Sequence, residues 1–245
     1  MKKNNFLKTI LCITAISASV LSAKAQDSNA TFSLSLTSDQ FFGVAPSAGV
    51  EYKLSDKIGV SAYGIFWGAG TAGAWGNWTE FGGGVNLYLA DGITLNPNIG
   101  FTFGDLLSKG ATSGQLGGIA GDGIVPNLFF NVDKPKFESE IYVGYYAPLR
   151  DEAPADASTL AYLHYWANAG FKVSQNFSAG GHFEHLRRTK DDVNGKLDYY
   201  QWLGPYVQFN VPRVASFIRL SAGPELKNGL QAKDSFYKLS TGFSF

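Results

Sequence analysis

The sequence predicts an all-β protein, a transmembrane antiparallel up-and-down β-barrel of about 12 strands. Three observations lead to this prediction. Apolar and polar residues alternate along most of the chain, short turns alternate with longer loops, and only 16% of the residues are charged. Alternation with a period of two is typical of strands that have one apolar face, and ordinary soluble domains contain about 25% charged residues.

The first 25 residues are expected to form a secretory signal peptide that is cleaved on export. Lysines precede a short apolar run, Ile10 to Leu21, and Ala23–Ala25 forms an A-x-A cleavage site. This run is too short to be a membrane-spanning helix. Cys12 does not follow a small residue, so lipidation is not favoured. Cleavage removes this cysteine and leaves residues 26–245 as a single barrel domain without disulfides or thiolate ligands.

The charge balance excludes one class of partner. Four of the twenty Lys and Arg residues lie in the signal segment, so the exported chain has a net charge of about −4. Nucleic-acid binding requires a basic stripe, and we therefore expect no nucleic-acid partner. No stretch of about 20 apolar residues follows the signal segment, so any membrane crossing must be made by strands.

Three segments show the alternation most clearly. Residues 93–103 carry Ile, Leu, Pro and Phe at odd positions, and Thr, Asn and Gly at even positions. Residues 80–89 and 203–211 have the same pattern. Because successive side chains of a strand point to opposite faces of the sheet, each segment has one apolar face and one polar face.

The connections between strands fall into two classes. Longer polar or glycine-rich segments separate the short turns, and a loop near Ser38–Gln40 joins the first two strands. Five turns that alternate with six loops give twelve antiparallel strands, with both chain ends at the short-turn end. The predicted turns are Ser55–Lys57, Ala90–Gly92, Asp133–Lys136, Ser174–Asn176 and Val211–Arg213.

The apolar face of each strand is predicted to point outward, toward lipid. The polar face carries mostly Asn, Thr, Ser, Gly and Tyr, whereas charges concentrate in loops such as Arg187–Asp192. A bilayer admits no open sheet edge, so the first and last strands must pair. Aromatic residues near strand ends are predicted to lie at the two lipid interfaces. They are Phe41, Phe42, Trp67, Trp75, Trp78, Tyr145, Tyr146, Tyr199 and Tyr200.

The last segment, SFYKLSTGFSF at residues 235–245, alternates and ends on Phe245. Together with the A-x-A signal and the absence of cysteine after residue 25, it resembles the C-terminal strand of porin-like Gram-negative outer-membrane β-barrel proteins. The resemblance implies export to the bacterial outer membrane, contact with outer-membrane lipids, and recognition by the barrel-assembly machinery through Tyr237, Leu239, Phe243 and Phe245. It covers residues 26–245 and identifies the architecture alone. We expect a monomer.

Strand parity predicts which side chains line the lumen. Acidic residues come early in the chain and basic residues late, so walls of opposite charge would favour small polar or zwitterionic solutes. Interleaved Tyr and Trp rings would offer stacking surfaces. These features predict a narrow channel for small polar solutes. The predicted lumen residues are Glu51, Glu80, Tyr88, Glu138, Glu140, Tyr142, His164, Trp166, His182, Glu184, Trp202, Tyr206, Arg219 and Lys238.

Two alternatives stay open. His182 and Glu184 share a face and form a candidate general base, with Ser178 on the same face near the other end of the strand. A G-x-S-x-G motif is absent from the sequence, so a lipid-modifying enzyme is the less favoured alternative. The other alternative is a structural or surface-binding barrel whose lumen is plugged.

A metal site and a cofactor are not predicted. Residues 190–198, KDDVNGKLD, resemble a calcium-binding loop in composition. When Gly195 is aligned as its sixth position, however, Lys190 takes the first ligand position and Gln201 takes the twelfth. A calcium loop needs an acidic ligand at the first position and a bidentate Glu at the twelfth.

Overall fold

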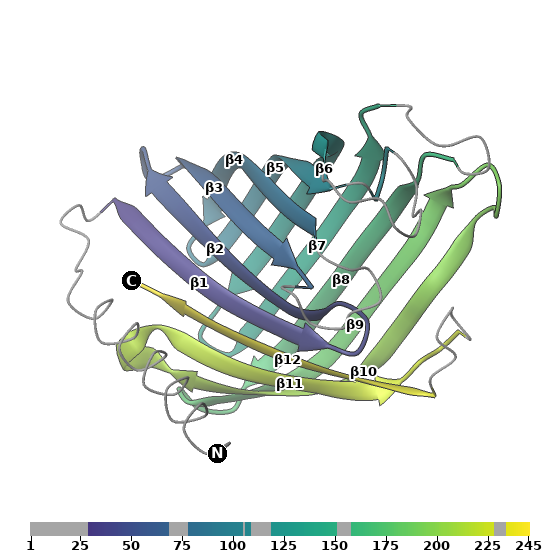
Figure 1. Ribbon diagram of the computed structural model, residues 1–245. Helices are drawn as coiled ribbons and strands as arrows, with labels where there is room; N and C mark the ends of the chain where they lie inside the picture. The colour runs from purple at the N-terminus through teal and green to yellow at the C-terminus, as the bar shows by residue number, and fades with distance from the viewer. Residues whose placement is uncertain (1–28, 69–77, 105, 109–118, 151–157, 228–233) are drawn as a thin grey trace, which may run out of the picture.

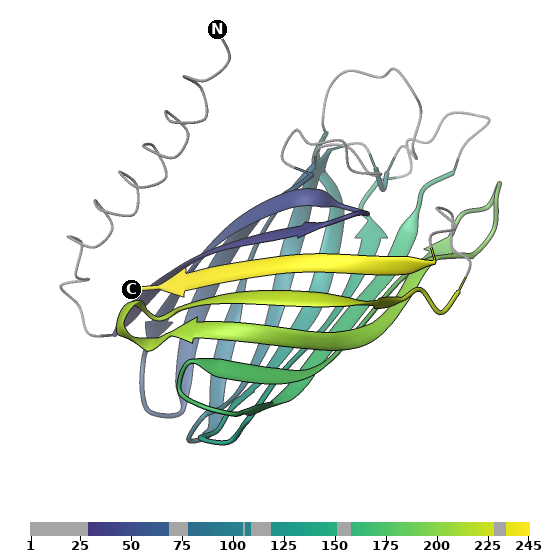
Figure 2. The ribbon, with the colours of Figure 1, turned by 90° about the horizontal axis from the view of Figure 1, so that it is seen from below.

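Twelve antiparallel strands close into one barrel in the computed structural model, which describes residues 29–68, 78–104, 106–108, 119–150, 158–227 and 234–245 (Figure 1, Figure 2). The predicted fold class is confirmed. Among the described residues, no helix is long and apolar enough to span a membrane. The predicted signal peptide and Trp75 lie outside the described residues.

The strands follow one another around the barrel in chain order, and η1, a single turn of 3-10 helix, precedes β11. The elements are β1 (Ala30–Asp39), β2 (Gly43–Lys53), β3 (Ile58–Trp67), β4 (Trp78–Ala90), β5 (Ile93–Gly104), β6 (Ile119–Asp133), β7 (Phe137–Pro148), β8 (Ala161–Lys172), β9 (Phe177–Lys190), β10 (Leu197–Val211), η1 (Pro212–Val214), β11 (Ser216–Pro224) and β12 (Ser235–Ser244).

Pairing of β1 with β12 closes the barrel, as predicted. The N–H of Phe245 donates to the carbonyl oxygen of Phe32 (3.0 Å), and the N–H of Phe32 donates to that of Phe245 (2.9 Å). The two rings stack with their centroids 5.6 Å apart. The terminal aromatic residue therefore belongs to the seam, where its backbone and its ring both have partners in β1.

The short turns gather at one end of the barrel, together with the C-terminus (Figure 2). All five predicted turns join strands at the expected places. The tightest, between β4 and β5, requires Gly92, whose φ of 61° lies in the left-handed region. A Cβ atom on Gly92 would also clash with the carbonyl oxygen of Asp133. This end is called the turn end below, and the opposite end the loop end.

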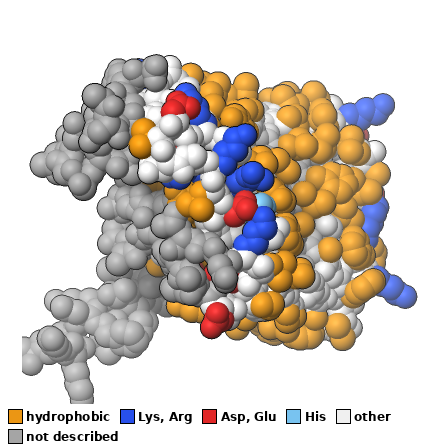
Figure 3. All heavy atoms as spheres, turned by 90° about the vertical axis from the view of Figure 1, so that its right-hand side faces the viewer, with side chains coloured by type: hydrophobic (Ala, Val, Ile, Leu, Met, Phe, Trp, Pro, Cys, Tyr) orange, Lys and Arg blue, Asp and Glu red, His pale blue; other side chains and the backbone are white. Residues whose placement is uncertain are grey.

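The apolar faces of the strands point outward, as predicted. On β5, Ile99 and Phe101 are 52% and 44% exposed, whereas Asn98 and Thr102, which flank them in the sequence, are buried. Figure 3 shows the resulting band of hydrophobic side chains on one side of the barrel. A surface of this kind is stable against acyl chains and is what a membrane-spanning barrel presents to lipid.

The interior at the loop end is filled by aromatic side chains that we call the aromatic plug. Leu106, Leu107, Val125, Leu160 and Leu186 belong to the same cluster. A barrel of twelve strands encloses more space than an eight-stranded barrel, whose interior side chains fill readily. Bulky rings are therefore needed to close the lumen of this barrel. The plug consists of Phe41, Phe42, Trp67, Trp78, Tyr146, Tyr162, Tyr199, Tyr200, Trp202 and Phe236.

The prediction that aromatic residues near strand ends face lipid is therefore wrong for most of them. Trp67 and Tyr199 are partly buried members of the plug, and Tyr145 is exposed on the outer surface. The sequence shows how near a ring lies to the end of a strand, but not whether the chain there turns inward. The residues that were predicted to lie at the lipid interfaces but are buried in the interior are Phe41, Phe42, Trp78, Tyr146 and Tyr200, each at most 5% exposed.

Candidate functional site: a plugged polar lumen

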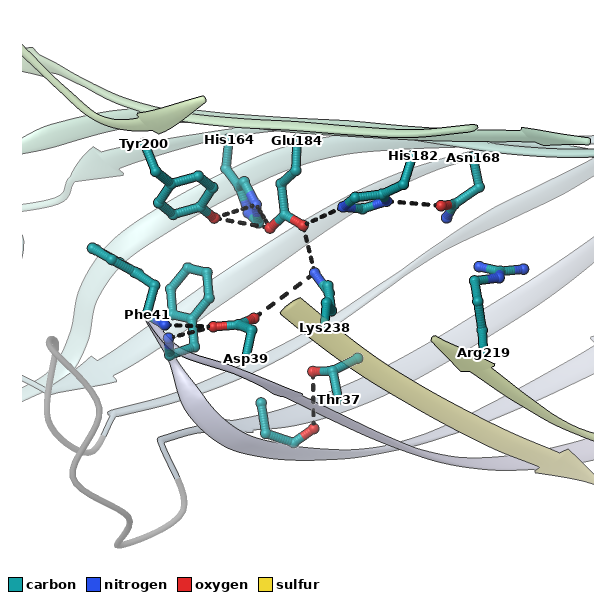
Figure 4. Close-up of polar contacts among 12 residues, drawn as sticks. Thr37, Asp39, Phe41, His164, Asn168, His182, Glu184, Tyr200, Arg219 and Lys238 are labelled. Atoms are coloured by element: carbon teal, nitrogen blue, oxygen red, sulfur yellow. Dashed lines mark hydrogen bonds and ion pairs between the residues drawn. The ribbon is translucent and has the colours of Figure 1, made fainter. Parts of the chain in front are cut away.

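The turn between β1 and β2 folds into the barrel and forms the centre of the plug (Figure 4). The Asp39 carboxylate accepts hydrogen bonds from the N–H groups of Phe41 (2.8 Å) and Phe42 (2.7 Å). Gly43, with a φ of 75°, lets the chain return into β2. The Phe42 ring lies 4.7 Å from that of Trp67, centroid to centroid. One short turn thus carries two of the rings that close the lumen.

Glu184 on β9 is fully buried and has four polar partners (Figure 4). Lys238 Nζ lies 2.6 Å from Oε2, and Tyr200 donates its hydroxyl to Oε1 at 2.8 Å. His164 Nε2 lies 2.9 Å from Oε1, and His182 Nε2 lies 3.2 Å from Oε2. A buried carboxylate is costly unless it is paired and hydrogen-bonded. These contacts satisfy Glu184 and join β8, β9, β10 and β12 beneath the plug.

Lys238 connects this centre to the turn that carries the plug. Its ammonium nitrogen lies between two carboxylates, 2.6 Å from Glu184 and 3.9 Å from Asp39. Asp39 in turn holds the backbone of Phe41 and Phe42. The position of the plug is therefore linked electrostatically to the buried centre on the barrel wall.

The polar contacts continue from the centre toward the turn end. His182 Nδ1 lies 2.8 Å from Asn168 Oδ1, and the Asn168 amide donates to Glu140 at 3.2 Å. Glu140 pairs with Arg219 at 2.5 Å, and Arg219 Nε donates to Gln208 at 2.7 Å. The result is an unbroken ladder of polar groups along the inner wall, which we call the lumen ladder.

The plug is also anchored from the opposite wall, by Glu80 on β4. Glu80 is buried and accepts hydrogen bonds from the Tyr63 hydroxyl (2.7 Å) and from the Trp67 indole N–H (3.3 Å). Asn127 donates to the Tyr63 hydroxyl at 2.8 Å. Trp67 is thus fixed by its indole nitrogen while its ring packs against Phe42.

Open space lies beneath the plug. A cavity of about 550 Å³ is lined by Phe42 and Trp67 on the plug side, by Trp166 and Lys238 on its walls, and by a row of hydroxyl groups on β1, β2 and β12. These hydroxyl groups belong to Ser33, Ser35, Thr37, Ser47, Ser240, Thr241 and Ser244.

A second cavity, of about 970 Å³, extends to the turn end, where Ser174 and Pro212 line it. It shares Glu140, Asn168 and Arg219 with the first cavity. The two cavities therefore adjoin each other at the Glu140–Arg219 pair, one on the plug side and the other at the turn end.

Six of the predicted lumen residues come together in the buried centre and the lumen ladder. The remaining predictions lie elsewhere on the inner wall. Trp202 stacks on Tyr200 within the plug, 3.9 Å between centroids, and Tyr142 and Trp166 stack beside the cavity at 5.8 Å. The six residues that meet are Glu140, His164, His182, Glu184, Arg219 and Lys238.

Two further pairs of predicted lumen residues lie outside the hydrogen bonds of the ladder. Glu138 accepts hydrogen bonds from the Ser178 hydroxyl (2.8 Å) and the Tyr206 hydroxyl (2.7 Å). Tyr88 donates to Glu51 near the turn end, beside a cavity of about 560 Å³. Ser178 is therefore paired with Glu138, and its hydroxyl is not the partner of His182 that an activated serine requires.

The acidic and basic groups that were expected to form facing walls are instead paired directly with one another. Arg219 pairs with Glu140, and Lys238 pairs with Glu184. Sequence reasoning missed Asp39, although an Asp two residues before Phe41 and four before Gly43 is a recognisable turn signal. Among the described residues, no group of three or more His, Cys, Asp or Glu side chains is placed to hold a metal ion.

No curated protein matches this sequence. Of the solved structures, an outer membrane channel from Pseudomonas putida F1 has a TM-score of 0.53 and 12% identity, and the similarity covers 90% of this chain and 97% of that one. The KdgM porin has a TM-score of 0.49 and 10% identity, with 87% and 99% covered. LpxR from Salmonella typhimurium has a TM-score of 0.43 and 11% identity, with 88% and 99% covered.

At 12% identity, the likeness to the Pseudomonas channel concerns the fold, which is the closed barrel of porin-like outer-membrane proteins. The whole chain, residues 1–245, matches a family of unknown function (DUF6733), and the protein belongs to that family.

Proposed function

We propose that this protein acts in the bacterial outer membrane as a narrow channel for small polar solutes, and that its aromatic plug is a gate, closed in this structure. The observation that carries the proposal is the pair of adjoining polar cavities between the turn end and the plug, which end at the aromatic rings of the plug. A barrel with a merely structural role has no need of such a space.

The side chains that line the cavity beneath the plug support the proposal that the solutes are small and polar. Hydroxyl groups on one wall and the Glu140–Arg219 pair on another offer both donors and acceptors to a small polar molecule. Because these charges are paired, the lumen favours neutral or zwitterionic solutes over simple ions. A volume of about 550 Å³ is within the range of small-molecule sites.

The plug has the properties expected of a gate. Twelve strands lie between the eight that side chains fill and the 16–18 that leave an aqueous channel, so a few rings decide whether the lumen is open. Phe41 and Phe42 are held by two hydrogen bonds to a single carboxylate, that of Asp39. Release of that one side chain would free the backbone of both residues without breaking a strand.

Single-channel conductance in planar bilayers tests the proposal. The wild-type barrel should conduct rarely, and the Phe41→Ala/Phe42→Ala variant should conduct steadily, since it removes the two central rings. The matched control replaces two outward phenylalanines, Phe171→Ala/Phe209→Ala, and should behave as wild type.

Heat-dependent migration in gels shows whether each variant is folded. A folded plug variant that never conducts would contradict the proposal and favour a structural barrel.

A further inference from the structure

The outer surface of the barrel carries a polar cluster at the loop end, where β8, β9 and β10 leave the hydrophobic band. Figure 3 shows basic, acidic and histidine side chains gathered at this border. We call this group the outer-face cluster; its members are Tyr165, His185, Arg187, Asp198 and Lys227.

Asp198 is the hub of the outer-face cluster. Its carboxylate lies 2.8 Å from His185 Nε2, 2.7 Å from Lys227 Nζ and 3.8 Å from Arg187 Nε. The other ring nitrogen of His185 lies 2.8 Å from the Tyr165 hydroxyl. The His185 side chain is only 6% exposed. The carboxylate is therefore held in one orientation by a buried imidazole, and the two basic side chains converge on it.

A β-bulge places Asp198 on the outside. In the pairing of β9 with β10, Asp198 is opposite Arg187 and Tyr200 is opposite Leu186, so Tyr199 is an extra residue. Strict alternation would put Asp198 on the same face as Tyr200, inside the barrel. Bulges re-aim side chains in this way, and they recur near functional sites.

The charges of the cluster favour an anion. Arg187 and Lys227 share a single carboxylate, and their side chains are 45% and 48% exposed. Within the described part of the chain, Asp198 at 3.8 Å is the one ion-pair partner of Arg187, which leaves this nearly half-exposed guanidinium able to pair with a further anion. Arg presents a fork that matches phosphate oxygens, and Lys adds a point charge.

The position of the cluster favours a lipid as the source of that anion. Farther along β10 from Asp198, beyond Gln201, the outward residues Leu203 and Val207 are 46% and 45% exposed and belong to the hydrophobic band. A lipid that lies along this band has its headgroup at the border where the cluster lies. Tyr165, with an apolar ring and a polar hydroxyl, suits the same border.

We propose that the outer-face cluster binds a phosphate-bearing lipid headgroup, with Arg187 and Lys227 as the two contacts to phosphate. Asp198 positions both cations, and His185 and Tyr165 hold Asp198. Asp198 also competes with the phosphate for the same two cations, which keeps the affinity moderate. This inference is independent of whether the lumen conducts.

Native mass spectrometry of the barrel in phosphatidylcholine nanodiscs tests the proposal. The probe is a bisphosphorylated disaccharide lipid, compared with the same lipid without its phosphates and with inorganic phosphate. The Arg187→Gln/Lys227→Gln variant should bind the phosphorylated lipid at least about tenfold more weakly than wild type, since two charge-assisted contacts are lost. The control Lys172→Gln removes a cation paired with Asp133 at the turn end and should leave binding unchanged.

The variant Asp198→Asn separates binding from a structural role. It removes the competing charge and should tighten binding by about threefold or more, whereas a purely structural cluster would bind no better. Equal binding of the lipid without phosphates, or wild-type binding by the Arg187→Gln/Lys227→Gln variant, would overturn the proposal. Inorganic phosphate that binds as tightly as the phosphorylated lipid would also overturn it, because the site would then be one for a free anion.

Discussion

Lys238 Nζ and Glu184 Oε2 lie 2.6 Å apart inside the barrel, where the Glu184 side chain is fully buried and that of Lys238 is 12% exposed. The two residues come from β9 and β12, which are not neighbours in the sheet. This pair crosses the lumen beneath the plug and, through Asp39, reaches the turn that carries the plug. One ion pair therefore connects the barrel wall to the turn that carries Phe41 and Phe42.

Breaking this pair from one side should be costly. Lys238→Met leaves the Glu184 carboxylate buried without its cation, so the free energy of unfolding should fall by about 3–5 kcal/mol. The double variant Lys238→Met/Glu184→Gln removes both charges and should recover most of that loss. Urea titration in detergent micelles, monitored by tryptophan fluorescence, measures the free energy of unfolding of both variants. If the double variant is no more stable than the single one, the pair does not make the predicted contribution.

The Asp39 carboxylate should control how often the plug opens. Asp39→Ala removes the acceptor for the N–H groups of Phe41 and Phe42. Hydrogen bonds to a charged group contribute about 1.5–3 kcal/mol, so the open probability should rise roughly tenfold or more. The control is Ser55→Ala, which removes a similar side-chain acceptor from the turn between β2 and β3. Equal conductance in the two variants would argue against Asp39 as the latch.

The Glu140–Arg219 pair should set ion selectivity once the plug is removed. In the Phe41→Ala/Phe42→Ala background, Arg219→Gln leaves the Glu140 charge alone in the lumen and should favour cations. Glu140→Gln leaves Arg219 alone and should favour anions. The reversal potential in a salt gradient should shift in opposite directions for the two variants. Shifts in the same direction would show that other charges dominate the lumen.

Asp191 should make the loop between β9 and β10 sensitive to acid. Burial raises the pKa of Asp191, but hydrogen bonds from Asn194, Val193 and Ser158 outweigh it and lower the pKa below the ordinary value of 3.8. A lowered pKa means that the stabilisation is complete above about pH 4, the pKa in the unfolded chain, and is lost as the pH falls through the folded value.

Pepsin cleavage of this loop should therefore increase as the pH drops below about 4. The variant Asp191→Asn should be cleaved at a similar rate across that range, because the titrating group is gone. A wild-type loop that resists pepsin equally at every acidic pH would contradict the prediction.

The strands and their faces could be predicted because alternation is a local property of the chain. Successive side chains of a strand point to opposite faces, so the apolar Ile99 and Phe101 point outward and the polar Thr102 points inward. The predicted turns, such as Ala90–Gly92, were also visible locally, since glycine and polar residues interrupt the alternation. Parity likewise predicted the inward face for Glu184 and Lys238.

The plug and the outer-face cluster could not be predicted from alternation. Phe41 and Phe42 lie outside any strand, and their inward course depends on hydrogen bonds to Asp39. Tyr199 is the extra residue of a bulge, and one extra residue reverses the face of everything before it. The contact of Glu184 with Lys238 depends on the barrel curvature that brings β9 opposite β12. This curvature cannot be predicted from a short segment of the sequence.

The seam between Phe32 and Phe245 has a consequence for biogenesis. Until β12 pairs with β1, the sheet has two edges of unpaired amides and carbonyls, and each is a template for a foreign strand. Barrel closure and insertion into the bilayer are therefore expected to occur together. An open sheet would aggregate in water, and its unpaired backbone groups would be unsatisfied in lipid. A shortened chain should accumulate as cross-paired aggregates rather than as a smaller cylinder.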